Sequence, residues 1–121
     1  MIDLMREMFF TPEAQADSYA WGAVLLAHGM IGVVLASLLA LIAGPIGGAV
    51  LTAAIYTLLW EGGQFVIAGA DLSDCTVDAA AVTLGAALVA ASAIRFRSAA
   101  WASIAGLALT LCIGINARRK R

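Results

Sequence analysis

Residues 20–48 read AWGAVLLAHGMIGVVLASLLALIAGPIGG and contain no aspartate, glutamate, lysine or arginine. A helix of about 20 apolar residues is long enough to cross the hydrocarbon of a bilayer. Gly44 and Pro45 interrupt the run, and proline inside a helix removes a hydrogen bond and clashes with the preceding turn. We therefore predict one membrane-spanning helix over 20–43 that ends at this pair, and a second that begins at Ile46.

The composition of the whole chain is typical of an integral membrane protein. Of its 121 residues, 63% are hydrophobic and 12% are charged, whereas a soluble domain is about half apolar and about a quarter charged. Uncharged or nearly uncharged runs predict the remaining spans, and the expected set is 20–43, 46–68, 74–94 and 99–116. The predicted fold is all-α: a polytopic membrane protein with four transmembrane helices in one compact bundle, forming a single domain over 1–121.

The two ends of the chain suggest how it sits in the membrane. Residues 1–10 place apolar side chains on one side of a helix and charged ones on the other, which predicts a short amphipathic helix lying on the membrane surface. The tail 117–121 holds four of the seven basic residues. Four spans put both termini on one side, where Arg6 and the tail outnumber Arg95 and Arg97 opposite, so we predict that both termini are cytoplasmic.

Four of the eight carboxylates lie within one short segment, from Glu61 to Asp78, which contains no lysine or arginine. Ionised side chains near lipid are costly and are usually kept for a function or a specific partner. Glu61 and Gln64 are three residues apart, and Asp74 and Asp78 are four apart, so each pair is expected to share one helix face. This segment is therefore where we expect a functional site.

Helical rise suggests that His28 belongs to the same site. It lies about 12 Å into the first span, and Glu61 lies about 22 Å down from the opposite face. In a hydrocarbon slab of about 30 Å these depths are similar. We therefore predict a polar pocket facing the cytoplasm, and its candidate lining residues are His28, Glu61, Gln64, Asp74 and Asp78.

Three chemistries fit such a pocket. Its oxygen atoms could hold a hard divalent cation such as Mg²⁺ or Ca²⁺. A histidine–carboxylate pair could shuttle protons, and an acidic pocket could receive a cationic or hydroxyl-rich head group. No spacing is diagnostic of a metal site, so beyond that cation no metal or cofactor is predicted. No pattern of nucleophile and base marks a catalytic residue, so whether the protein is an enzyme stays open.

Small residues recur at four-residue steps in two of the predicted spans. In the first span Gly32, Ala36 and Ala40 follow His28, and small residues form a similar series in the last span. Such faces allow helix backbones to approach closely in lipid. The bundle could use them to pack on itself, or the last series could join two copies of the chain, through Ala102, Gly106, Thr110 and Gly114. The other expected partner is the lipid bilayer, and no nucleic acid is expected.

The acidic segment resembles the VanZ-like family of small bacterial membrane proteins. That family pairs Glu-x-x-Gln at the end of one span with Asp-x-x-x-Asn-x-x-Gly-x-x-x-Gly at the start of the next. Glu61 and Gln64 match the first part, and Asp74 and Gly85 match the ends of the second. Asp78 stands at the asparagine position, alanine replaces the first glycine, and the arginine usual between the two halves is missing. The similarity covers roughly residues 55–90.

The resemblance implies a helical-bundle protein of the bacterial inner membrane, from a family linked to glycopeptide resistance. On this basis we expect the pocket to bind or act on an envelope lipid or a small ligand. Two other hypotheses fit the size and the short, small-residue spans. One is a phage-type holin or another membrane-permeabilising protein. The other is an accessory subunit of a larger membrane complex, without chemistry of its own.

Overall fold

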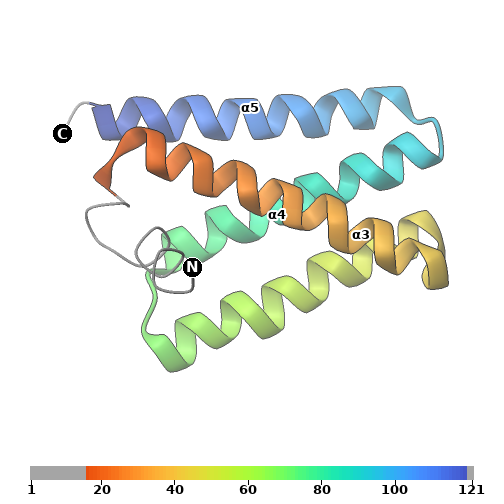
Figure 1. Cartoon of the computed structure of the whole chain (residues 1–121), viewed down its shortest axis with the longest axis horizontal. Helices are drawn as coiled ribbons and strands as arrows, with labels where there is room; N and C mark the ends of the chain where they lie inside the picture. Colours follow the sequence, from red (N-terminus) through yellow and green to blue (C-terminus); the bar gives the residue numbers. More distant parts are fainter. Residues whose placement is uncertain (1–15, 120–121) are drawn as a thin grey trace, which may run out of the picture.

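The computed structural model of the chain describes residues 16–119, and this part of the chain contains helices and no strands. The predicted all-α fold is therefore confirmed. The elements in chain order are α3 (Ser18–Ile55), η1 (Tyr56–Glu61), η2 (Gln64–Ala68), α4 (Leu72–Ala93) and α5 (Arg97–Arg119). Figure 1 labels the three α-helices. The amphipathic helix predicted over 1–10 lies outside the described residues, as does the very end of the basic tail.

The break predicted at Gly44 and Pro45 is a sharp reversal of direction inside α3. Gly44 alone leaves helical geometry, with φ 73° and ψ 169°, and the helix resumes at Pro45. A Cβ atom on Gly48 would lie 2.8 Å from the carbonyl oxygen of Ala36. Residues twelve apart would be separated by about 18 Å in a straight helix. The two limbs of α3, before and after Gly44, therefore lie against each other near the reversal, and Figure 1 shows them diverging towards their other ends.

The four-helix count is not supported. Among the described residues, three helices are long and apolar enough to cross a membrane: Ser18–Ala68, Leu72–Ala93 and Arg97–Arg119. The first has 51 residues because the interruption at Gly44 is only one residue wide and the π-helical segments η1 and η2 continue the second limb. The sequence predicted the position at which the helix is interrupted, but it did not show that the interruption is a single residue.

The second limb ends in an acidic turn that leads into α4. Gly69 adopts a left-handed conformation with φ 66°, which favours glycine, and closes η2. Asp71 is the N-cap of α4, since its Oδ1 accepts a hydrogen bond of 2.7 Å from the Ser73 N–H. The turn thus places Asp74 in the first turn of α4 and Asp78 one turn further along.

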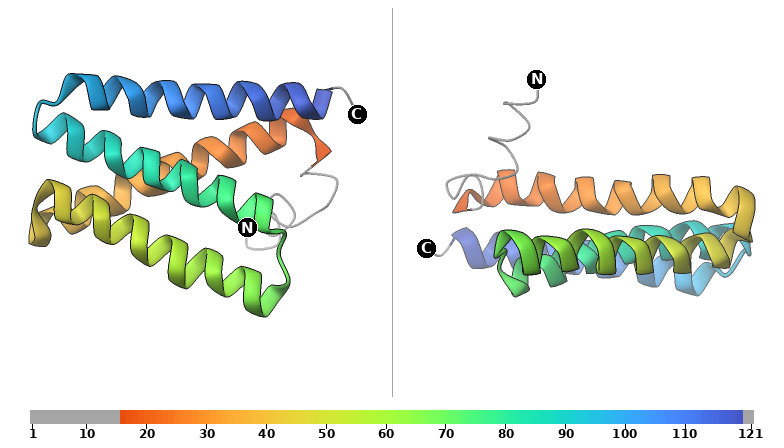
Figure 2. Two further views of the ribbon diagram at one scale, coloured as in Figure 1. Left: turned by 180° about the vertical axis from the view of Figure 1, so that it is seen from behind. Right: turned by 90° about the horizontal axis from the view of Figure 1, so that it is seen from below.

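The first limb of α3 lies across a layer that is formed by the second limb, α4 and α5 (Figure 2). Glycines allow it to approach α4 very closely. A Cβ atom on Gly32 would overlap the Val82 carbonyl oxygen, and one on Gly85 would overlap the Gly29 carbonyl oxygen. In these contacts the backbone of one helix lies directly against the backbone of the other, because the glycines have no side chain to keep them apart.

The small-residue series of α5 also faces the chain's own helices. A Cβ atom on Gly106 would lie 3.2 Å from methyl carbons of Leu84, and one on Gly114 would overlap the Trp21 ring. Thr110 is half-buried and donates to the Gly106 carbonyl, whereas Ala102 is exposed. Packing within the bundle thus accounts for the two glycines. A contact between two copies through the same series stays a prediction.

The outer surface is strongly apolar, as the predicted membrane location requires. Exposed large hydrophobic side chains occur on every helix, for example Leu41 at 85%, Ile67 at 87% and Trp101 at 69% exposure. A soluble protein rarely exposes apolar surface on this scale. The described chain therefore combines a helical bundle with three helices able to span a membrane.

Candidate functional site

The first member of the candidate site, His28, lies on the first limb of α3, on the side that faces the layer below. It is 8% exposed. Its Nδ1 lies 2.8 Å from the Val24 carbonyl oxygen, and this oxygen can only accept a hydrogen bond. In the neutral ring the proton is therefore held on Nδ1, which leaves the free lone pair on Nε2.

Glu61, the second member, is the last residue of the π-helical segment η1. It is 4% exposed, which is rare for a carboxylate unless it is paired. Tyr56, the first residue of η1, is buried with it and interacts with the Glu61 carboxyl group. A π-helix bonds residue i to residue i+5, so it brings these two residues to the same side. In an α-helix they would point about 140° apart.

Asp78, the third member, approaches from α4. Its Oδ1 lies 3.6 Å from Nδ1 of His28, and its side chain is 25% exposed. One donor atom each from His28, Glu61 and Asp78 lies within 4.8 Å of the other two. We call these three residues the buried cluster. It joins side chains that are separated in the sequence by up to fifty residues, and it lies between the first limb of α3, η1 and α4.

The buried cluster is rich in negative charge and incompletely hydrogen-bonded. The charged groups that act on Asp78 are His28, Glu61 and Asp74, and no arginine or lysine of the described chain is among them. Within the described residues, Oε1 of Glu61 and the hydroxyl of Tyr56 have no hydrogen-bond partner. Buried polar groups without partners are rare in folded proteins, and each calls for an explanation.

Of the five residues predicted for the pocket, the structure brings three together. Gln64 is half-buried at the start of η2, and no described contact joins its side chain to the buried cluster. The prediction assumed an α-helix, in which residues three apart share a face. Gly62 and Gly63, which separate the two residues, are α-helical, so sharing a helix face with Glu61 does not by itself bring Gln64 into contact with the buried cluster.

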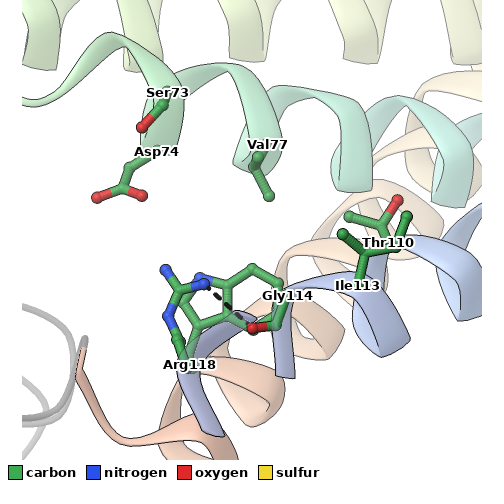
Figure 3. Close-up of a pocket in the computed structure, with 8 residues that line it drawn as sticks. Ser73, Asp74, Val77, Thr110, Ile113, Gly114 and Arg118 are labelled. Atoms are coloured by element: carbon green, nitrogen blue, oxygen red, sulfur yellow. Dashed lines mark hydrogen bonds between the residues drawn. The ribbon is translucent and has the colours of Figure 1, made fainter. Parts of the chain in front are cut away.

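Asp74 lines a second space, at the end of the bundle where α5 finishes. This space measures about 270 Å³ and is lined also by Trp21 and Arg118. Figure 3 shows Asp74 and Arg118 on opposite sides of it. The Arg118 guanidinium lies 4.1 Å from the centre of the Trp21 ring, an arrangement typical of a cation–π contact. We call this space the end pocket.

Asp71 belongs to the turn and not to either site. It is fully exposed, and the hydrogen bond from the Ser73 backbone N–H lowers the pKa of its carboxyl group below 3.8. The bond stabilises the ionised form, as expected for an N-cap aspartate at the positive end of a helix dipole.

Sequence reasoning missed Tyr56 and Cys75. Both are buried, and both interact with the Glu61 carboxyl group. Cys75 directly follows Asp74 within the acidic segment, and nothing in the sequence around it indicated a contact with Glu61. Tyr56 lies five residues before Glu61, a spacing that points to a shared side only when the helix is a π-helix.

Comparison with models of known protein families, with curated proteins and with solved structures finds no match to this chain.

Proposed function

We propose that the protein is a VanZ-like protein of the bacterial inner membrane whose buried cluster binds or acts on an envelope lipid or a small ligand. The observation that carries this proposal is the convergence of His28, Glu61 and Asp78 within 4.8 Å in an otherwise apolar bundle. Keeping ionisable groups inside such a bundle is costly, and membrane proteins usually do so at the sites where they work.

The reversal at Gly44 supports four membrane crossings in spite of the continuous first helix. A straight helix of 51 residues would be about 77 Å long, far longer than the hydrocarbon of about 30 Å. Two limbs of roughly half that length each fit. With four crossings the acidic turn and the C-terminal end of α5 share one side, and the basic residues of the tail favour the cytoplasm for that side.

A groove on the outer surface favours a lipid as the ligand. Six side chains line a space of about 380 Å³, namely Ile31, Leu35, Ile55, Tyr56, Leu59 and Trp60. Several are exposed on the face that would contact acyl chains, including Leu59 at 74% exposure. Tyr56 lines the groove and also interacts with Glu61. An apolar chain in the groove would therefore bring a polar head group to the buried cluster.

Native mass spectrometry of the full chain in mild detergent tests the proposal. We expect the wild-type protein to carry a co-purified lipid or small molecule, and Glu61→Gln and Asp78→Asn to lose most of it. Asp74→Asn is the matched control, since it neutralises an aspartate on the same helix that lines the end pocket instead. Circular dichroism and size-exclusion profiles establish that each variant is folded.

A wild-type protein without any co-purified ligand, or equal occupancy in all folded variants, would overturn the proposal. Two further outcomes would identify the other hypotheses. Collapse of the membrane potential on induction would indicate a holin. Isolation with one stoichiometric protein partner would indicate an accessory subunit.

A further inference from the structure

The buried cluster carries more negative charge than its surroundings balance. Glu61 and Asp78 supply two carboxyl groups, and within residues 16–119 His28 is the only basic side chain among the charged groups acting on Asp78. Glu61 is 4% exposed, and its Oε1 has no hydrogen-bond partner in the same part of the chain. Burying even one ion without compensation costs several kcal/mol. A bound divalent cation would offset both charges and would occupy the unpartnered carboxylate oxygen.

We propose that His28, Glu61 and Asp78 form a binding site for a divalent first-row transition metal, with Zn²⁺ the best fit. This inference rests on the proposed function, because it names a ligand of the same site. Imidazole is a good ligand for Zn²⁺, whereas Mg²⁺ and Ca²⁺ prefer oxygen atoms alone. One histidine and two carboxylates therefore favour Zn²⁺ over the hard cations that the acidic sequence pattern first suggested.

The geometry is close to what the ion needs. Donor atoms bound to one tetrahedral Zn²⁺ at about 2.0–2.2 Å lie about 3.3–3.6 Å apart. The three donor atoms of the buried cluster lie within 4.8 Å of one another, so rotations of the side chains must bring them up to about 1.5 Å closer for a tetrahedral site. The Val24 carbonyl holds Nδ1 of His28, the usual outer contact of a metal-binding histidine, so the imidazole would bind the ion through Nε2. The Asp78 carboxylate, which lies 3.6 Å from Nδ1, would have to turn towards that side of the ring.

Three protein ligands leave one position of a tetrahedral zinc site open, the arrangement found where the metal acts on a bound molecule. Tyr56 and Cys75, which are both buried, interact with the Glu61 carboxyl group. A lipid head group arriving from the groove at Tyr56 would reach this open position. The metal would then explain how an acidic cluster binds a group that carries oxygen atoms.

Metal analysis and zinc titration of the detergent-purified full chain test the inference. We expect one Zn²⁺ per wild-type chain, bound at least about 100-fold more tightly than Mg²⁺ or Ca²⁺. Glu61→Gln, Asp78→Asn and His28→Gln should each weaken zinc binding at least about 100-fold. Asp74→Asn and Asp71→Asn should leave it unchanged. Glu61→Gln keeps the shape of the side chain and removes a buried charge, so this variant is expected to fold.

Cobalt substitution adds a readout that does not depend on any variant. Co²⁺ in the wild-type site should show the intense visible absorption of a tetrahedral ion, without a thiolate charge-transfer band. Absence of stoichiometric zinc from the wild-type protein, equal affinity for Mg²⁺, or unchanged binding in the folded cluster variants would each overturn the inference. Zinc bound without any lipid would overturn the proposed function alone, and lipid bound without zinc would overturn only the metal site.

Discussion

Asp74 and Asp78 lie one turn apart on α4 and meet opposite surroundings. Asp74 lines the end pocket, across from an arginine that rests on the Trp21 ring. Asp78 contacts a buried histidine at 3.6 Å and lies near a glutamate that is cut off from solvent. Asp74 thus faces an open pocket that contains a cationic side chain, whereas Asp78 faces the interior of the helical bundle. What differs is the neighbour of α4 at each level.

The close contact between α3 and α4 creates this difference. Beyond Asp78 the two helices meet backbone to backbone at Gly32 and Gly85, which leaves no room for water between them. Towards Asp74 the end of α5 and Trp21 of α3 face α4 across the end pocket, and the contacts are made by larger side chains. The comparison therefore predicts that the buried cluster depends on the glycine contact, whereas the end pocket does not.

The largest effect is expected from Gly85→Ala, which breaks that contact. Its Cβ would overlap the Gly29 carbonyl oxygen, and backbone cannot move aside as a side chain can. We expect a loss of about 3 kcal/mol of stability, measured by unfolding in detergent followed by circular dichroism. The matched control is Gly106→Ala on α5. There the nearest atoms are Leu84 methyl carbons at 3.2 Å, which can rotate, so the loss should stay below about 1 kcal/mol. Equal losses in the two variants would contradict the comparison.

A smaller effect should separate Asp78 from Asp74 directly. In a double-mutant cycle of His28→Gln with Asp78→Asn, we expect a coupling free energy of about 1 kcal/mol in unfolding measurements, because the two side chains are in contact. The cycle of His28→Gln with Asp74→Asn should give a value near zero. Coupling of similar size in both cycles would show that the two aspartates belong to one network.

The smallest effect is expected at the exposed cap. The folded pKa of Asp71 is lowered below 3.8 by its hydrogen bond, so its contribution to stability is present above about pH 4 and is lost as the pH falls through the folded pKa. Thermal unfolding between pH 3 and 6 should show this dependence in the wild-type protein. The dependence should diminish in Asp71→Asn, which keeps a good N-cap without the charge. An unchanged pH profile would mean that the cap does not contribute.

The sequence predicted what depends on composition and local geometry. The apolar runs gave the all-helical fold, the Gly44–Pro45 pair gave the position of a break, and depth alone placed His28 beside Glu61. What could not be predicted depends on contacts between helices and on helix type. Nothing local shows that the break at Gly44 is a single residue, or that the segment after Ile55 is π-helical. For that reason Tyr56 was left out of the predicted pocket.

The π-helical pitch of η1 makes the site sensitive to the number of residues as well as to their identity. Each residue of an α-helix turns the chain by about 100°. With α-helical pitch and the same number of residues, the Glu61 carboxylate would point about 140° away from Tyr56, whereas removing one residue as well would leave the pair four apart and only about 40° from each other. A related protein with one residue fewer in this short stretch could therefore keep the cluster on an ordinary α-helix, whereas one with the same number of residues needs the π-helical pitch.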